Sequence, residues 1–224
     1  MSSEPDQPAE NTPPRRIPRL GWAIAFLVAT ALIAWSYVQF QDTLRARGAL
    51  PTRLERLAPA PEFRFTAQDG STVSPEDLKG RVWVVNFIFT RCLGPCPLMT
   101  SRMAELNQRL GSKTADVNLV SITVDPEYDT PEVLKAYGEK VGARPERWKF
   151  LTGPRAQIEE TIQKGFLQAL GRDQEGMPVH STRFVLVDKD GWIRGFQDGN
   201  DPEVVQKLLM DIGDILREPA RTTR

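Results

Sequence analysis

Residues 82–100, VWVVNFIFTRCLGPCPLMT, decide how the rest of the chain is organised. The stretch opens with a run of β-branched and aromatic residues, 82–89, interrupted only by Asn86. A short apolar run of this composition predicts a strand that is buried on both faces, typical of the centre of an α/β sheet. Pro97 suits the first turn of a helix, and apolar side chains at helical spacing continue to Leu110.

The two cysteines of the chain lie in the loop between this strand and this helix. Cys92 and Cys96 are separated by three residues. Open α/β sheets bind their ligands at this edge, beyond the carboxyl ends of the strands. A helix N-terminus lowers the pKa of a nearby thiol and favours the thiolate, which attacks disulfides and binds soft metals. The sequence therefore predicts a redox or metal site in this loop.

Composition excludes several classes of protein. The 224 residues include 29 basic and 29 acidic side chains, so the formal net charge is zero. Nucleic-acid binding requires a basic excess, which is absent here. Two cysteines cannot build a disulfide-rich scaffold, and there is one histidine.

The N-terminal part is expected to anchor the chain in a membrane. Residues 1–19 are rich in Pro, Ser, Glu and Gln and are expected to be disordered. Residues 20–41 carry no charge and are long enough to cross the ~30 Å hydrocarbon core. Trp22, Trp35 and Tyr37 would lie near its ends, and no cleavage site follows, so we expect a retained transmembrane helix. Arginines flank both ends, so charge does not decide its orientation, although the short N-terminus favours an exported domain.

Residues 42–60 are interpreted as a linker, residues 61–217 as one domain and residues 218–224 as a tail. The domain opens with a β-hairpin that turns at Asp69 and Gly70. Strands are expected over 117–124, 148–152, 183–187 and 192–196, helices over 131–142, 154–166 and 201–217, and a mobile loop over 165–177. This order predicts a thioredoxin-like α/β fold with an N-terminal β-hairpin extension.

His180 is the third candidate for the cysteine site. A single histidine is more often structural than a ligand, but this one precedes the strand expected at 183–187. In a thioredoxin-like sheet, that segment lies against the active-site cysteines. Two thiolates and one imidazole form a soft ligand set suited to copper, Cu(I) especially. Structural zinc would need a fourth ligand, and no other Cys or His exists. The alternatives for Cys92 and Cys96 are a structural disulfide or buried free thiols.

Three further positions show weaker indications of a functional role. Met177 could supply a thioether ligand, but a packing role is favoured. Asp125 ends a predicted strand at the same sheet edge as the cysteines, so it is either a supporting or partner-docking carboxylate or a turn residue before Pro126. Residues 188–191, DKDG, lack the remaining ligands of a calcium loop and are interpreted as a hairpin turn.

Four ordered motifs resemble the Sco/SenC family of copper proteins, over roughly residues 61–216. They are Phe89-Thr90-x-Cys92-x-x-x-Cys96-Pro97, the stretch 124–137 (VDPEYDTPEVLKAY), Trp148-x-Phe150-Leu151-Thr152-Gly153, and His180-Ser181-Thr182 followed by a strand and Asp188-x-x-Gly191. The resemblance implies a thioredoxin-like fold and copper held by Cys92, Cys96 and His180. One departure is Leu93, where the family usually has proline directly after the first cysteine; it puts the rigidity of the loop in doubt.

The resemblance also implies a role and a location. The family delivers copper to, or reduces the thiols of, the binuclear copper site of cytochrome c oxidase. The implied partners are the copper-bearing subunit of that oxidase, a copper donor protein and a thiol–disulfide reductant. The implied location is the bacterial inner membrane, with the soluble domain in the periplasm.

We therefore expect a membrane-anchored copper chaperone rather than an enzyme. The main alternative is a thiol–disulfide oxidoreductase that uses Cys92 and Cys96 for exchange. Against it, the usual redox spacing has two intervening residues, and His180 has no role in it. A peroxidase similar to the peroxiredoxins, or an assembly factor with a permanent Cys92–Cys96 disulfide, are the remaining alternatives.

Overall fold

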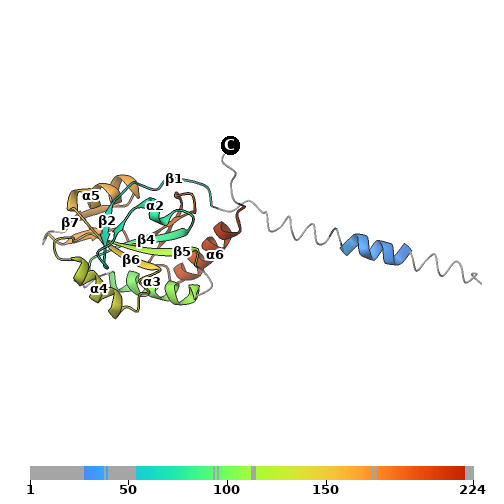
Figure 1. Ribbon diagram of the computed structural model, residues 1–224, viewed down its shortest axis with the longest axis horizontal. Helices are drawn as coiled ribbons and strands as arrows, with labels where there is room; N and C mark the ends of the chain where they lie inside the picture. Colours follow the sequence, from blue (N-terminus) through green and yellow to red (C-terminus); the bar gives the residue numbers. More distant parts are fainter. Residues whose placement is uncertain are drawn as a thin grey trace, which may run out of the picture. The chain divides into compact units, whose positions relative to one another are not determined.

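The computed structural model describes residues 28–37, 39, 54–92, 94, 96–111, 115–172, 174 and 176–219. The chain divides into two units, residues 1–50 and 51–224. In the first unit, residues 28–37 are helical (Figure 1), and their side chains are exposed. No helix within the described ranges has both the length and the apolar character needed to span a bilayer. Residues 20–27, 38, 40 and 41 of the predicted anchor lie outside the described residues. So do the predicted disordered segment 1–19 and most of the predicted linker and tail.

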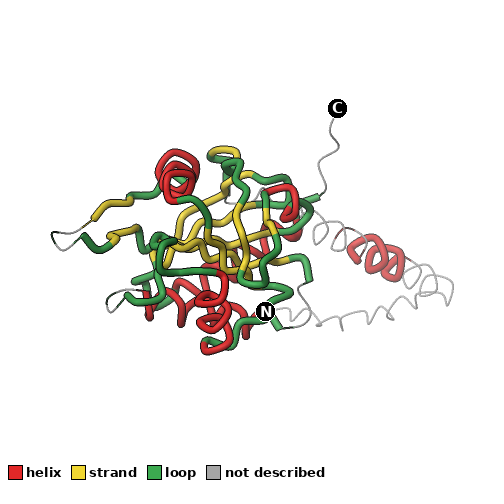
Figure 2. Tube along the Cα trace, turned by 60° about the vertical axis from the view of Figure 1, so that its left-hand side comes forward, coloured by secondary structure: helices red, strands yellow, loops and turns green. Residues whose placement is uncertain are grey.

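An eight-stranded mixed sheet forms the centre of the second unit (Figure 2). Its strand order is β1-β10-β9-β4-β5-β6-β2-β3. The central strands β4 and β5 are parallel, and β9 lies antiparallel to β4 on its other side. The strands are β1 (Ala58–Pro59), β2 (Phe65–Ala67), β3 (Thr72–Val73), β4 (Val82–Ile88), β5 (Val117–Thr123), β6 (Trp148–Thr152), β9 (Arg183–Val187) and β10 (Trp192–Asp198).

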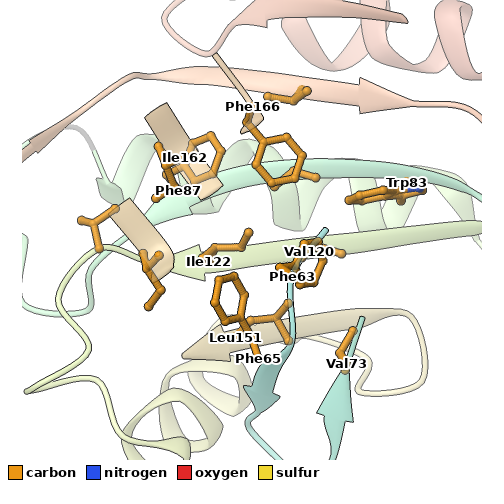
Figure 3. Packing of buried hydrophobic residues seen from close by; sticks show 14 of the residues in the cluster. Phe63, Phe65, Val73, Trp83, Phe87, Val120, Ile122, Leu151, Ile162 and Phe166 are labelled. Carbon is orange, nitrogen blue, oxygen red and sulfur yellow. The ribbon is translucent and has the colours of Figure 1, made fainter. Parts of the chain in front are cut away.

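Helices cover both faces of the sheet because alternate residues of β4 point to opposite sides. Val82, Val84 and Ile88 pack in one buried cluster with side chains of α3 (Cys96–Leu110), α4 (Pro131–Lys140) and α6 (Val204–Arg217). Trp83 and Phe87 pack in the other with α5 (Arg155–Glu160) and the π-helix η1 (Thr161–Gly165). Figure 3 shows the side chains of Trp83, Phe87 and Ile162 in this cluster. The short helix α2 (Pro75–Leu78) follows the first hairpin. The predicted mixed α/β order is thus confirmed.

The structure differs from the predicted elements in three places. Ala58 and Pro59, within the predicted linker, pair with β10. The predicted mobile loop at 165–177 contains β7 (Leu170–Arg172), which pairs with β8 (Pro178–His180) as a separate two-stranded sheet. The helix predicted over 154–166 turns into η1 after Glu160. Strands of two or three residues are too short to give a periodic sequence signal, which explains the first two differences.

A buried arginine joins the two ends of the second unit. The Arg194 guanidinium, 1% exposed, donates to Asp188 at 3.0 Å and to Glu218 beyond the last helix. Its Nε also donates to the Leu54 carbonyl at 3.1 Å. Asp188 follows the end of β9, which pairs with the beginning of β4. This cluster therefore lies at the opposite end of β4 from the cysteine loop.

Candidate metal centre

The cysteine loop connects the carboxyl end of β4 to the first turn of α3, as predicted. Cys96 is the first residue of α3 and is buried, whereas Cys92 in the loop is partly exposed. Both are free thiols. The Gly94 amide donates to the Cys92 sulfur at 3.4 Å, so backbone of the loop itself supports this thiol. Leu93 and Pro95 lie outside the described residues, and the effect of Leu93 stays a prediction.

His180 on β8 contacts Cys96 directly. The Cys96 Sγ lies 3.2 Å from His180 Nε2, across 84 residues of sequence. The other ring nitrogen, Nδ1, lies 2.9 Å from the carbonyl oxygen of Ser181. A carbonyl oxygen can only accept, so Nδ1 carries the proton and the lone pair of Nε2 faces the sulfur. The ring also packs edge-to-face on Phe89 at 5.9 Å. This is the orientation in which an imidazole can bind a metal ion through Nε2.

Burial dominates the acid–base properties of this pair. Burial, together with a hydrogen bond to Cys92, raises the pKa of the Cys96 thiol well above its ordinary value. The prediction that the helix N-terminus lowers the thiol pKa is wrong for Cys96, because loss of hydration outweighs the favourable helix dipole. Burial also lowers the pKa of His180. The metal-free pair is therefore a neutral thiol beside a neutral imidazole, and a metal ion that binds here must displace the thiol proton.

The structure brings the predicted site residues together only in part. Cys96 contacts His180, and the Cys92 thiol lies close enough to Cys96 to affect its pKa. Within the described ranges, however, no three Cys, His, Asp or Glu side chains already surround a point that could hold a metal ion. Met177 packs against the core cluster, in line with the packing role favoured from sequence.

Asp129 is a supporting residue that sequence reasoning missed. Its carboxylate is 0% exposed and accepts hydrogen bonds from the Thr90 amide at 3.1 Å and the Thr123 hydroxyl at 2.5 Å. Burial raises the pKa of Asp129, and the hydrogen bonds from the two threonines oppose that shift. In sequence it directly precedes Thr130, the N-cap of α4, and looks like an ordinary loop residue. No local signal reveals that it holds the cysteine loop.

Asp125 supports the same loop from a second position. It is buried, and it accepts a hydrogen bond from Arg91 Nε at 2.7 Å. The Arg155 guanidinium lies 3.8 Å from its other oxygen. Arg91, adjacent to Cys92, in turn stacks on Tyr128 at 4.9 Å from the ring centre. Of the two sequence interpretations of Asp125, this geometry favours the supporting carboxylate.

The chain is similar to known proteins over most of its length. The family model described as SCO1/SenC matches residues 52–215. The chain belongs to the SCO1/SenC family. The fold is therefore the Sco type of thioredoxin fold, as the sequence motifs predict.

Solved structures of this family are similar over most of their length. A SCO1/SenC family lipoprotein from Bacillus anthracis has a TM-score of 0.69 and 33% identity, covering 74% of this chain and 99% of that one. BsSco, described with a disulfide switch and as a member of the Sco family of cytochrome c oxidase assembly proteins, has a TM-score of 0.65 and 35% identity, covering 72% and 96%. ScoI of Bradyrhizobium japonicum with copper bound has a TM-score of 0.61 and 25% identity, covering 70% and 99%.

Proposed function

We propose that this SCO1/SenC family protein binds copper and acts as a chaperone in the assembly of cytochrome c oxidase. In this role it delivers copper to the binuclear copper site of the oxidase or reduces the thiols of that site. The observation that carries the proposal is the 3.2 Å contact between Cys96 Sγ and His180 Nε2. Two soft-metal ligands from distant parts of the chain meet there, next to a second thiol. Membership of a family with a copper-bound structure supports the same function.

The proposed ligands are Cys92, Cys96 and His180. Sulfur and nitrogen ligands of first-row metals such as zinc lie about 2.0–2.3 Å from the ion. Two such atoms 3.2 Å apart can share one ion without moving far. Cys92 completes the set by a shift of the loop that carries it. Binding releases the protons of the two thiols, so copper affinity falls as the pH is lowered.

The differing exposure of the two thiols suits transfer. Cys92 is partly exposed and Cys96 buried. A recipient thiolate can therefore reach copper from the Cys92 side while Cys96 and His180 retain it. We propose the copper-bearing oxidase subunit as recipient, with a copper donor protein and a thiol–disulfide reductant as further partners. We also propose an anchor over residues 20–41, with the domain in the bacterial periplasm.

Copper titration of the full-length chain in detergent tests the ligand set. Wild type is expected to bind one copper ion, with a visible thiolate-to-Cu(II) absorption band. Cys92→Ser, Cys96→Ser and His180→Ala should each lose affinity and change that band. Met177→Leu is the matched control and should behave as wild type. Unchanged affinity and absorption in His180→Ala would refute the three-ligand site.

The same exposure pattern also favours a second function, reduction of disulfides. The Cys92 thiolate would attack a target disulfide and form a mixed disulfide, releasing one target thiolate. Cys96, after losing its proton, would then displace the second target sulfur and close the Cys92–Cys96 disulfide. An insulin-reduction assay distinguishes the two functions. Rapid turnover without copper, lost in both cysteine variants and retained in His180→Ala, would favour the reductase.

A further inference from the structure

The carbonyl group that orients His180 belongs to a residue that is itself held in place. Ser181 accepts the Nδ1 proton of His180 at 2.9 Å. The Ser181 amide donates to the Ala169 carbonyl at 3.0 Å. Its hydroxyl oxygen accepts from the Arg183 amide at 3.2 Å, so the hydroxyl proton needs an acceptor elsewhere. That acceptor is Gln168, whose Oε1 lies 2.7 Å from Ser181 Oγ.

Gln168 is fixed on every side. Its side chain is buried, at 4% exposure. Its backbone amide donates to the Ile162 carbonyl at 3.0 Å, and its Nε2 donates to the Phe166 carbonyl at 2.9 Å. Both acceptors belong to the segment formed by η1 and the residue after it. The one remaining polar atom of the side chain, Oε1, accepts from the Ser181 hydroxyl, so Gln168 links the η1 segment to the residue that orients the imidazole.

We propose that Gln168 is a positioning residue for His180, acting through Ser181. The Gln168 acceptor holds the Ser181 hydroxyl, and the held Ser181 presents its carbonyl to Nδ1. This keeps the proton on Nδ1 and the Nε2 lone pair toward Cys96. Hydrogen-bond partners of metal-binding histidines fix the tautomer and ring orientation in this way. The proposal rests on the proposed function, in which His180 is a ligand, and it adds a residue whose side chain bonds to Ser181 and Phe166 rather than to a ligand.

Ser181 offers a pair of substitutions that isolates the hydroxyl group. Ser181→Thr and Ser181→Val have side chains of the same shape, but only threonine keeps the donor. Gln168→Leu removes the acceptor from the other side. Gln163→Leu is the matched control. The side-chain amide of Gln163 donates to the carbonyl of Leu170 on β7 rather than to Ser181.

Imidazole ¹⁵N chemical shifts of the metal-free protein report the tautomer directly. The chain has one histidine, so the signals need no assignment to a residue, and couplings to the carbon-bound ring protons distinguish Nδ1 from Nε2. Wild type, Ser181→Thr and Gln163→Leu should show one tautomer, protonated at Nδ1. Ser181→Val and Gln168→Leu should show a mixture with the Nε2-protonated form. A purely structural role would lower stability without changing the tautomer.

Copper affinity provides the second measurement. Loss of a residue behind a metal ligand typically costs 10–100-fold in affinity, and we expect about 10-fold for Ser181→Val relative to Ser181→Thr. Wild-type tautomer and affinity in Ser181→Val would overturn the proposal, even if Gln168→Leu fails to fold. Failure of the proposed function would look different from failure of this proposal. If the proposed function is wrong, His180→Ala binds copper like wild type, whichever tautomer the Ser181 variants show.

Discussion

The carboxylate of Asp129 accepts a hydrogen bond from the backbone amide of Thr90, at 3.1 Å, without any exposure to solvent. Thr90 lies two residues before Cys92, and Asp129 lies in the loop after β5. The same carboxylate accepts from Thr123, the last residue of β5. One buried side chain thus fastens the cysteine loop to the neighbouring strand.

Replacing Asp129 with alanine should loosen this loop. Asp129→Ala leaves the Thr90 amide and the Thr123 hydroxyl without their acceptor, and we expect a loss of about 2–3 kcal/mol of stability. Cys92 should also react faster with an alkylating reagent at a urea concentration far below unfolding. Asp214→Ala, at a partly exposed position, is the control and should change stability by less than about 0.5 kcal/mol. Equal Cys92 reactivity in the two variants would contradict the anchoring role.

The lowered pKa of His180 predicts a loss of stability on acidification. Its ordinary value is 6.5, and burial lowers it in the folded protein. As the pH falls below the ordinary value, the unfolded chain takes up a proton that the folded chain does not, so folding becomes less favourable. The loss ends once the folded pKa is reached. Each pKa unit between the two states corresponds to about 1.4 kcal/mol.

Urea unfolding of the metal-free protein measures this effect. The free energy of unfolding of wild type should exceed that of His180→Gln by less and less as the pH is lowered from about 7.5 to about 5. The reason is that histidine titrates in this range and glutamine does not. An advantage that stays constant or grows over this range would show that His180 is not neutral in the folded state.

Gly199 is the glycine whose replacement should be most harmful near the site. A Cβ at this position would lie 2.0 Å from the Met99 sulfur and 2.6 Å from the Thr182 carbonyl oxygen. Met99 is fully buried, and the Gly199 amide donates to that carbonyl at 2.9 Å, so neither neighbour moves freely. We expect Gly199→Ala to cost about 3 kcal/mol in thermal or urea unfolding. Gly171→Ala, with no atom within 4 Å of the added Cβ, is the control and should be nearly neutral.

Leu167 is the one residue other than glycine with a positive φ, 57°, in the described part of the chain. Its side chain is 56% exposed, so little packing offsets the strained backbone. A left-handed conformation costs a non-glycine residue about 1 kcal/mol. Leu167→Gly should therefore raise stability by up to about 1 kcal/mol. Leu57→Gly, at a similarly exposed leucine with ordinary φ, should lower stability, and a loss in both variants would show that Leu167 is unstrained.

The sequence was most informative where elements are long and apolar. Residues 82–88 and 117–123 form the predicted central strands, and Thr130 caps the helix that Pro131 begins. The position of Cys96 between a central strand and a helix, and its contact with His180, could also be anticipated, since both follow from the order of strands and helices.

Features that depend on tertiary contacts were not predictable. Burial, rather than the helix dipole, sets the pKa of Cys96, and burial cannot be judged from residues near it in sequence. The roles of Asp129 and Gln168 depend on partners in other segments. The strands β7 and β8 have three residues each, which is too short to be distinguished from a loop by sequence pattern.

The cluster of Arg194, Asp188 and Glu218 should decide where a mechanical load enters the domain, because Arg194 also binds the Leu54 carbonyl. A pull on the chain ahead of Leu54 is transmitted first to the Leu54 carbonyl and to β1, both of which are attached to β10. The load therefore enters the sheet at the end remote from Cys92.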